Sequence, residues 1–418
     1  MRNIEKVLAN HVCTGCGICE NICPHHCINT RLDSKRGHYI TTLNLKQCID
    51  CGLCQKVCPV YTWNNRESNP YVGEYCKIYS GYSMNEQHRI SSASGGMTTS
   101  ILAYLLSSKT IEAAVVAVRN EERPLESELR IVSTNEDVCA SKGSVYSPTS
   151  YCDIISEIKE SSFSKFAVVG LPCHVEGLMR LCEMDKKLRE KIILKIALVC
   201  GHTPTINAYN YSLRHLNIKV SDVVALSNRG EGWPGYMQIK TCDETITKVP
   251  YGSKYSWGQT LGSPCFTPSG CKHCSDVTGY HADISICDAW LPQYSSDKKG
   301  RNLLLIRSEI ILKILNDMYE AKIVELSEES VDNFIVANKS VFKEKLHINS
   351  IRNSRLKQIG LFPNVEYLKI EDPKTSCLIC LLLMSEKIFC KLPINDLSLL
   401  FLKVFKYLSV KWIKLRIF

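Results

Sequence analysis

Cysteines are the residues of this chain whose type and spacing point most directly to chemistry. The chain contains 23 cysteines, and nine of them lie within its first 58 residues. Eight of these nine form two copies of the pattern C-x2-C-x2-C-x3-C-P, which begin at Cys13 and at Cys48. In a reducing compartment, clustered cysteines more often bind metal or take part in redox chemistry than form disulfides. The cysteines therefore indicate metal or redox chemistry.

The doubled pattern is the spacing with which bacterial ferredoxins bind two [4Fe–4S] clusters. Three closely spaced thiolates can bind three irons of one cubane, and the fourth cysteine then reaches the other cubane. The spacing therefore predicts two clusters, each held by three cysteines of one copy and the last cysteine of the other. The predicted ligands are Cys13, Cys16, Cys19 and Cys58 for one cluster, and Cys48, Cys51, Cys54 and Cys23 for the other.

A structural zinc module is the alternative for this region. Zinc sites take four thiolates, but they need neither a third C-x2 step nor a proline after the fourth cysteine. The glycines of the pattern, Gly15, Gly17 and Gly52, permit backbone turns close to the inorganic sulfides. Cys27 lies outside the pattern, and we interpret it as a bystander.

Four later cysteines also lie in unusual contexts. Cys173 is expected where a buried strand becomes a helix, and the helix N-terminus would stabilise its thiolate. Cys200 is expected at the end of another buried strand, and Cys271 and Cys274 form a C-x2-C pair on a glycine-rich loop. Together they could hold a third cluster. The alternative is that they are small hydrophobic residues, as buried cysteines usually are.

The elements that must position these cysteines follow from apolar runs and turn residues. Strands are predicted at residues 114–118, 166–170, 192–199, 223–226, 236–240, 245–249, 283–287 and 303–306. Helices are predicted after the turn at Gly96, after Pro172, from Pro204 with Thr203 as its cap, and over 310–319. This order predicts an α+β fold, with a small bacterial ferredoxin-like two-cluster domain followed by a mixed α/β body.

We expect four segments along the chain. Residues 1–65 form the ferredoxin-type domain, and a polar stretch at 64–70 is a linker. Residues 75–160 and 161–345 form the two parts of the body, and residues 346–418 form a basic, apolar extension.

Composition and charge exclude some classes of protein. The 418 residues are 45% hydrophobic and 22% charged, which excludes a disordered or collagen-like chain. The net charge is +9, and residues 374–418 carry eight basic against two acidic residues, or +6. We find no nucleic-acid-binding motif and expect no nucleic-acid partner. The N-terminus does not read as a signal peptide, and no apolar run reaches the ~18 residues of a membrane span, so we expect a cytoplasmic protein.

Several motifs in order resemble the beta-subunit family of the deazaflavin coenzyme (F420) hydrogenases and dehydrogenases, which includes the plant 7-hydroxymethyl chlorophyll reductase. The motifs are SSASGG at 91–96, SKGSVY at 141–146, GLPC at 170–173, VCGH at 199–202, and the Cys271/Cys274 pair followed by ADISICDAW at 282–290. The resemblance covers roughly residues 1–345. It implies FAD, a third [4Fe–4S] cluster on Cys173, Cys200, Cys271 and Cys274, and electron transfer between carriers and a substrate at the flavin.

The flavin implied by this resemblance also has a physical basis in the sequence. Four residues precede a predicted helix, where hydroxyls and backbone N–H groups can hold a pyrophosphate: Ser92, Ser94, Gly95 and Gly96. Lys142 and Ser144 can add a cation and a hydroxyl, and Asp288 can accept a hydrogen bond from the ribityl chain or the ring. A plain capped turn at 91–96, and a cap or turn role for Asp288, are the alternatives.

Two histidines and two tryptophans lie near these motifs. His174 and His202 follow predicted cluster ligands, and each is either a hydrogen-bond donor or proton carrier at the site or a structural histidine. Trp233 and Trp257 lie in loops rich in glycine and proline, where they either line a flavin or substrate pocket or simply pack.

The C-terminal segment is expected to be a basic amphipathic helix over residues 399–418. Such a helix can lie on an anionic membrane surface, or it can pack on the body or on a partner subunit. Cys377, Cys380 and Cys390 lack the iron–sulfur spacing, and we interpret them as hydrophobic positions.

Three functions remain open from the sequence. The first is an iron–sulfur flavoenzyme that moves electrons between a ferredoxin-like or deazaflavin-type carrier and an unidentified organic substrate at FAD. The second is a non-catalytic electron-transfer subunit of a larger complex, and the third is a chain whose clusters are structural or sensory. No catalytic acid or base can be named. Flavin content separates the first function from the third, and turnover by the isolated chain separates it from the second.

Overall fold

The computed structural model describes residues 3–61, 69–349 and 352–353. Most of the predicted linker lies outside these residues, and so does nearly all of the predicted C-terminal extension. The amphipathic helix expected at 399–418 and the cysteines Cys377, Cys380 and Cys390 also lie outside the described residues. Among the helices that the structure describes, none is both long enough and apolar enough to cross a membrane.

The N-terminal domain consists of short elements around one antiparallel hairpin. In chain order these are α1 (Glu5–Ala9), the 3-10 turn η1 (Ile18–Glu20), β1 (Ile28–Asp33), β2 (His38–Leu43), α2 (Leu53–Val57) and the 3-10 turn η2 (Pro59–Tyr61). Gly17 and Gly52 stand directly before η1 and α2 with φ of 77° and 83°. Glycine takes this left-handed backbone without strain, as predicted for the turns of the cysteine pattern.

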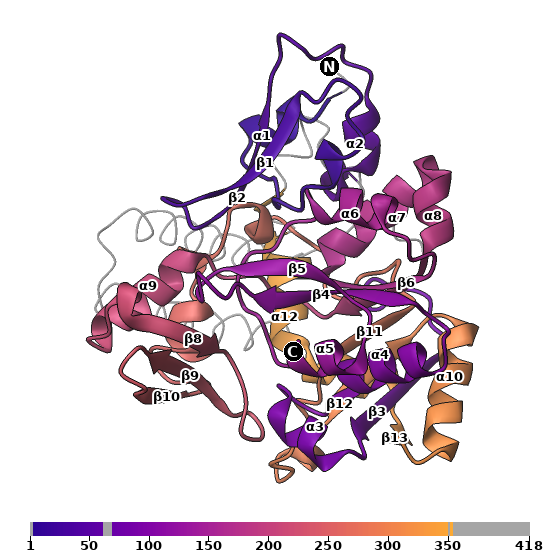
Figure 1. Cartoon of the computed structure of the whole chain (residues 1–418), viewed down its shortest axis with the longest axis vertical. Coiled ribbons are helices and arrows are strands. Elements are labelled where there is room, and N and C mark those ends of the chain that lie inside the picture. The colour runs from indigo at the N-terminus through magenta and orange to yellow at the C-terminus, as the bar shows by residue number, and fades with distance from the viewer. Residues whose placement is uncertain (1–2, 62–68, 350–351, 354–418) are drawn as a thin grey trace, which may run out of the picture.

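The body is built on an eight-stranded mixed sheet (Figure 1). Its strand order is β13 (Val324–Glu328), β3 (Lys77–Ser83), β12 (Asn302–Ile306), β11 (Ile284–Asp288), β7 (Ile192–Leu198), β6 (Phe166–Gly170), β4 (Ala113–Arg119) and β5 (Ser127–Val132). The four strands β11, β7, β6 and β4 are parallel to one another, and the remaining pairings are antiparallel. The carboxyl ends of parallel strands meet at one edge of a sheet, which is where open α/β sheets bind ligands.

Helices cover both faces of this sheet. On one face lie α4 (Met97–Ser107), α5 (Asn135–Ala140) and α10 (Glu309–Glu320), and on the other lie α6 (Ile154–Glu160), α7 (Pro172–Met184) and α8 (Lys186–Lys191). Strand residues alternate between the two cores: Phe166 and Val168 pack with α6 and α7, whereas Ala167 and Val169 pack with α4. This alternation is the period of two expected for a buried strand.

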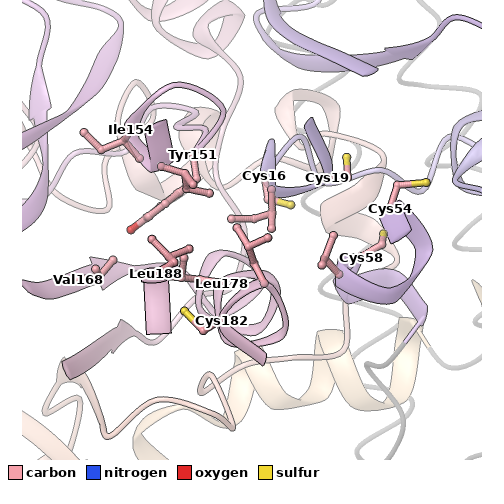
Figure 2. Packing of buried hydrophobic residues seen from close by; sticks show 14 of the residues in the cluster. Cys16, Cys19, Cys54, Cys58, Tyr151, Ile154, Val168, Leu178, Cys182 and Leu188 are labelled. Atoms are coloured by element: carbon pink, nitrogen blue, oxygen red, sulfur yellow. The ribbon is translucent and has the colours of Figure 1, made fainter. Parts of the chain in front are cut away.

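The N-terminal domain packs on the body through a shared core. Figure 2 shows Cys16, Cys19, Cys54 and Cys58 on one side of this core, with Tyr151 and Leu178 of the body on the other. The Tyr151 N–H donates to the carbonyl of Cys16 at 2.8 Å, which joins the two parts through their backbones. The cysteine-rich domain is therefore fixed against the body.

The remaining elements surround the sheet. A small antiparallel sheet, β10 (Ile246–Pro250), β9 (Tyr236–Thr241) and β8 (Val223–Ser227), lies beside α9 (Ile206–His215). The other helices are α3 (Glu86–Ser91), α11 (Val331–Ala337) and α12 (Lys339–Phe342), and α12 runs directly into a π-helical segment, η8 (Lys343–Ile348). Short 3-10 turns are η3 (Val220–Asp222), η5 (Pro264–Phe266), η6 (Gly270–Lys272) and η7 (Pro292–Tyr294), and η4 (Trp257–Leu261) is a π-helical segment.

The predicted fold class is confirmed, with one helix start wrong. All eight predicted strands are present, with ends shifted by at most a residue or two. The helix predicted to begin at Pro204 begins instead at Ile206, after Thr205. The Thr205 N–H is held in the preceding loop by the Phe266 carbonyl at 2.7 Å, which delays the start of the helix.

Candidate functional site

Two cavities of the N-terminal domain are lined by the cysteines of the doubled pattern. The lining of the inner cavity includes Cys13, Cys16, Cys19 and Cys58, and that of the outer cavity includes Cys23, Cys48, Cys51 and Cys54. Helix α2 borders both, since its Cys54 lines the outer cavity and its Val57 the inner one. The structure thus brings together the two sets of four cysteines that the sequence pairs.

Three of the inner cysteines, Cys16, Cys19 and Cys58, are buried, and Cys13 is partly buried. Burial raises the pKa of Cys13, and burial with the neighbouring Cys13 thiol raises the pKa of Cys16 to about 11. Burial also raises the pKa of Cys19 and Cys58 well above the ordinary value, and adjacent thiols add to the effect. Four thiolates are costly in such a place without a positively charged partner, and binding metal releases their protons.

These thiols surround a space and do not converge on one point. Within the described residues, no three His, Cys, Asp or Glu side chains are placed to share a single metal ion. A cubane takes one thiolate on each iron, so cysteines spread around a cavity suit it.

The outer cavity lies at the protein surface. Cys51 is exposed and Cys48 is partly exposed. Two apolar side chains close to them in sequence are also exposed, Leu45 at 54% and Ile49 at 62%. A cluster held here would be accessible to another protein.

Cys27 also lines the outer cavity, although the sequence analysis set it aside as a bystander. Its sulfur lies 3.2 Å from the sulfur of Cys23. Burial and the nearby Cys23 and Cys48 thiols raise the pKa of Cys27 to about 12. Burial opposes ionisation of Cys23, but hydrogen bonds from Cys27 and nearby backbone lower its pKa overall. Cys27 therefore stands beside Cys23 at the outer cavity and forms a sulfur–sulfur contact with it.

A third cavity of about 40 Å³ lies where the N-terminal domain meets the body. Thr14 lines it from the N-terminal domain, and the body contributes all four cysteines predicted for a third cluster: Cys173, Cys200, Cys271 and Cys274. Thr14 also lines the inner cavity, so the two cavities are neighbours.

The large sheet and the loop that carries Cys271 and Cys274 bring these four cysteines together. Cys173 lies in the first turn of α7 directly after β6, and Cys200 follows the adjacent parallel strand β7. Cys271 lies in η6, and a Cβ on the preceding Gly270 would fall 2.1 Å from the Cys13 carbonyl oxygen. Only glycine at position 270 lets this loop come so close to the inner cavity.

Cys173 lies in the first turn of α7, where the sequence predicts a stabilised thiolate. Burial raises its pKa well above the ordinary value, and the thiols of Cys16, Cys274 and Cys200 raise it further. Burial and the neighbouring thiols thus oppose the stabilisation expected from the helix end, and a stabilised Cys173 thiolate stays a prediction.

One cation borders the third cavity. Lys345 of η8 is 3% exposed, and its ammonium donates to the Asp276 carbonyl at 2.6 Å and lies 3.3 Å from the sulfur of Cys274. Burial alone would lower the pKa of Lys345, but Cys274, Cys200 and Cys271 hold it above its ordinary value. The lysine therefore stays charged among these thiols.

A large cavity of about 540 Å³ lies at the carboxyl ends of the parallel strands. His174 and Cys200 line both this cavity and the third cavity, so the two adjoin. A volume in this range suits a cofactor or substrate. Six of the seven residues predicted for the flavin line it, namely Ser92, Ser94, Gly96, Lys142, Ser144 and Asp288.

The turn at 91–96 presents a buried hydroxyl to this cavity. The Ser92 hydroxyl is buried and has no hydrogen-bond partner among the described residues, whereas that of Ser94 donates to the Arg301 carbonyl at 2.8 Å. Gly96 precedes α4 with φ of 77°, and the first turn of α4 also lines the cavity. Gly95 does not line the cavity. It packs against β3, where a Cβ at position 95 would lie 2.8 Å from the Gly81 carbonyl oxygen.

Asp288 is engaged by protein groups at the cavity wall. Its Oδ2 accepts from Arg229 Nη1 at 2.7 Å and from Trp233 Nε1 at 3.0 Å. Arg229 is 3% exposed, and its Nη2 has no hydrogen-bond partner among the described residues. Burial opposes the charge, but Asp288 and Tyr146 raise the pKa of Arg229. Asp288 therefore holds the Arg229 guanidinium in place at the cavity wall.

Aromatic rings stand beside this arginine. Arg229 lies 4.6 Å from the ring centre of Tyr251, and Tyr251 stacks on Trp290 with centroids 5.7 Å apart. Both rings line the cavity and offer flat apolar surface to a planar ligand. Trp233 packs on Trp290 at 4.4 Å and is not part of the lining.

Both histidines singled out from the sequence line the large cavity. Burial lowers the pKa of His174 to about 4, so its ring is neutral, and its Nδ1 accepts from the Leu171 N–H at 3.3 Å. His202 stacks on Trp257 at 5.3 Å, and its Nε2 is 3.1 Å from the Leu261 carbonyl. His174 thus separates the third cavity from the large cavity without carrying charge.

Sequence reasoning missed Arg229, Tyr251, Trp290 and Lys345. Arg229 and Tyr251 lie in or beside the small sheet, and Lys345 follows the last body helix. Their sequence neighbourhoods contain no motif, and only the fold brings them to the cavities. Trp290 is the last residue of the family motif at 282–290, and its place in that motif was a signal that could have identified it.

The two cysteine-lined cavities of the N-terminal domain indicate an iron–sulfur protein, and the family comparisons agree and place it in the oxidoreductase class. A 4Fe-4S dicluster domain model matches residues 12–62. The models for the N-terminal and C-terminal parts of the coenzyme F420 hydrogenase/dehydrogenase beta subunit match residues 78–156 and 163–332. The chain belongs to the coenzyme F420 hydrogenase/dehydrogenase beta-subunit family, as its motifs predicted.

Similar curated proteins come from Methanosarcina, Methanothermobacter and Methanocaldococcus species. The chain is 26% identical over 326 residues to a subunit of the F(420)H(2) dehydrogenase of Methanosarcina mazei, covering 73% of this chain and 82% of that one. It is 24% identical over 262 residues to the beta subunit of coenzyme F420 hydrogenase of Methanothermobacter thermautotrophicus, covering 61% and 85%. Coenzyme F420-dependent sulfite reductase of Methanocaldococcus jannaschii is 24% identical, with 78% of this chain but 49% of that enzyme covered.

A solved structure shares the fold. It is a chain of the F420-reducing [NiFe] hydrogenase complex from Methanosarcina barkeri, with a TM-score of 0.53 and 19% identity. The match covers 69% of this chain and 96% of that one, which establishes the architecture of the body.

Proposed function

We propose that this chain is an iron–sulfur flavoprotein that moves electrons between a redox carrier and an organic substrate bound at FAD. In this account Cys23, Cys48, Cys51 and Cys54 hold an outer [4Fe–4S] cluster, and Cys13, Cys16, Cys19 and Cys58 hold an inner one. A third cluster is held by Cys173, Cys200, Cys271 and Cys274, and FAD occupies the large cavity.

The continuity of the cavities carries this proposal. The outer and inner cavities share helix α2, and Thr14 lines both the inner and third cavities. His174 and Cys200 then line both the third and the large cavity. A row of sites from the surface to a ligand cavity is what one-electron transfer to a buried reaction centre requires.

The donor groups of the large cavity fit a flavin nucleotide. The unpartnered Ser92 hydroxyl and the first turn of α4 suit a pyrophosphate, and Lys142 adds a cation. The unpartnered Nη2 of Arg229 suits an anionic or carbonyl oxygen of the flavin or the substrate. Buried polar groups are normally satisfied, so these two indicate a ligand.

The cofactors supply the redox chemistry, since iron–sulfur clusters carry single electrons and a flavin can exchange either one electron or a pair. The chain contributes binding, orientation and the exclusion of water. Asp288 fixes the Arg229 guanidinium, and neutral His174 closes the wall between the third and large cavities.

The substrate and carrier are proposed from relatives and from the cavity. Relatives are named for coenzyme F420, so we propose a deazaflavin-type or ferredoxin-like carrier as the redox partner. The flat surface of Tyr251 and Trp290 beside Arg229 suits a planar anionic molecule.

A second candidate is an electron-transfer subunit that hands electrons to a partner enzyme. The exposed Leu45 and Ile49 near the outer cavity favour a protein partner, and the relatives include subunits of complexes. Turnover of a deazaflavin or other acceptor by the isolated chain would distinguish the two functions.

Stoichiometry tests the proposed function. The chain should be purified without oxygen, and iron, acid-labile sulfide and flavin should be measured per protein. We expect about twelve irons and one FAD, the content of three [4Fe–4S] clusters and one flavin site. About eight irons without flavin would leave only the ferredoxin-type domain functional.

A further inference from the structure

The segment after α12 holds the loop that carries Cys271 and Cys274. Asn349 Nδ2 donates to the Cys274 carbonyl at 2.7 Å, and Asn353 Nδ2 donates to the His273 carbonyl at 2.8 Å. Arg352 donates through Nη1 to the Lys272 carbonyl. Three consecutive loop residues are thus bound by side chains of one segment.

Lys345 belongs to the same segment and contacts the same loop. Lys345 itself donates to the Asp276 carbonyl at 2.6 Å and lies 3.3 Å from the Cys274 sulfur. The family model of the C-terminal part of the body ends at residue 332, so this clamp lies beyond it.

Lys345 is only 3% exposed, so the burial of its charged ammonium requires an explanation. A buried charge is strongly unfavourable unless negative groups compensate it, and the groups that favour this one are the thiols of Cys274, Cys200 and Cys271 and the carboxylate of Asp276. A third cluster with four thiolates carries net negative charge, and reduction adds one more negative charge. A fixed cation beside it would stabilise both states and the reduced state more.

Resting on the proposed third cluster, we infer that the clamp formed by Lys345, Asn349, Arg352 and Asn353 is part of that cluster's site and that Lys345 is its charge partner. Lys345 is a positioning residue that raises the reduction potential of the third cluster. The step involved is uptake of one electron, and the lysine neither gains nor loses a proton. Net charge and hydrogen bonds to sulfur are among the factors that set cluster potentials.

The experiment is a redox titration of the third cluster in the full chain, followed by electron paramagnetic resonance, with iron content measured on the same samples. The variants are Lys345→Met, Lys345→Gln, which keeps a donor but no charge, and Lys345→Arg, which keeps the charge. Lys339→Met on the exposed side of α12 is the matched control.

In Lys345→Met and Lys345→Gln we expect the reduced-to-oxidised ratio of the third cluster at fixed potential to fall at least tenfold, a shift of about 59 mV for one electron. Lys345→Arg and Lys339→Met should stay near wild type. If Lys345→Met loses the third cluster, retention in Lys345→Arg but not in Lys345→Gln would support the charge role. An unchanged potential in Lys345→Met or Lys345→Gln with twelve irons retained, or equal loss in all three Lys345 variants, would overturn it.

Failure of the proposed function can be distinguished from failure of this inference about Lys345. A wild-type chain with about eight irons has no third cluster for Lys345 to act on. Twelve irons in wild type with no potential shift in Lys345→Met would instead refute only this inference.

Discussion

The sulfur of Cys27 lies 3.2 Å from the sulfur of Cys23, one of the four cysteines assigned to the outer cluster. A fifth thiol therefore stands within reach of the position of one ligand. The inner cavity has no such thiol, because its lining among the described residues contains four cysteines only.

This proximity predicts that Cys27 can replace Cys23. Cys27→Ala and Cys23→Ala should each keep nearly all iron, whereas the double variant should lose about four irons. Cys58→Ala is the matched control at the inner cavity and should lose about four irons alone. If Cys23→Ala by itself lost as much iron as the double variant, Cys27 would have no ligand role.

Ser92 and Ser94 should respond differently to removal of the hydroxyl. Ser92→Ala should leave the stability of the flavin-free protein unchanged but weaken flavin binding about tenfold or more, since hydrogen bonds to charged groups contribute about 1.5–3 kcal/mol. Ser94→Ala removes a bond to the Arg301 carbonyl and should cost about 1 kcal/mol of stability. Flavin titration and thermal unfolding measure both effects. Equal flavin affinity in wild type and Ser92→Ala would show that this hydroxyl does not meet the cofactor.

The Arg229–Asp288 pair should matter for both folding and ligand binding. Arg229→Met leaves the Asp288 carboxylate without its cation and should cost about 3–5 kcal/mol, as loss of one partner of a buried pair does. Lys248→Met breaks the exposed pair with Glu231 and should cost less than about 1 kcal/mol. Denaturant unfolding gives both values. Similar small losses in the two variants would mean that burial does not strengthen the Arg229 pair.

Burial of His174 predicts a pH dependence of stability. Its pKa is about 4 in the folded chain and about 6.5 when unfolded, so the unfolded chain binds more protons between these values. Stability is therefore full above about pH 6.5 and falls, by at most about 1.4 kcal/mol per pH unit, as the pH drops toward 4. His174→Gln should lose this part of the slope in Tm between pH 7 and pH 5.5, while exposed His26→Gln should keep it. An identical slope in wild type and His174→Gln would contradict the assignment.

Local spacing allowed the cysteine sites and much of the body to be predicted. The doubled pattern specifies its ligands within short turns. Strands such as β6 are continuous apolar runs, a pattern that predicts a buried strand. The ordered motifs also led to the correct family, because each lies at a strand end or loop that lines a cavity.

Features that depend on pairing over long distances could not be predicted. Strand β3 reads KIYSGYS, a mixed sequence that becomes a strand because β12 and β13 pair with both its edges. Arg229 and Lys345 carry no local motif, and their burial beside Asp288 and Cys274 is a property of the folded chain. The orientation of Asp288 toward Arg229 was missed for the same reason.

The most direct test of the account is the rate at which flavin in the chain is reduced when electrons arrive at the outer cluster from a reduced ferredoxin. Cys173→Ser should remove the third cluster, keep the other eight irons and the flavin, and slow flavin reduction at least tenfold, or about 1.4 kcal/mol in the barrier. Flavin reduction at the wild-type rate in a Cys173→Ser protein that has lost those four irons would contradict the proposed path.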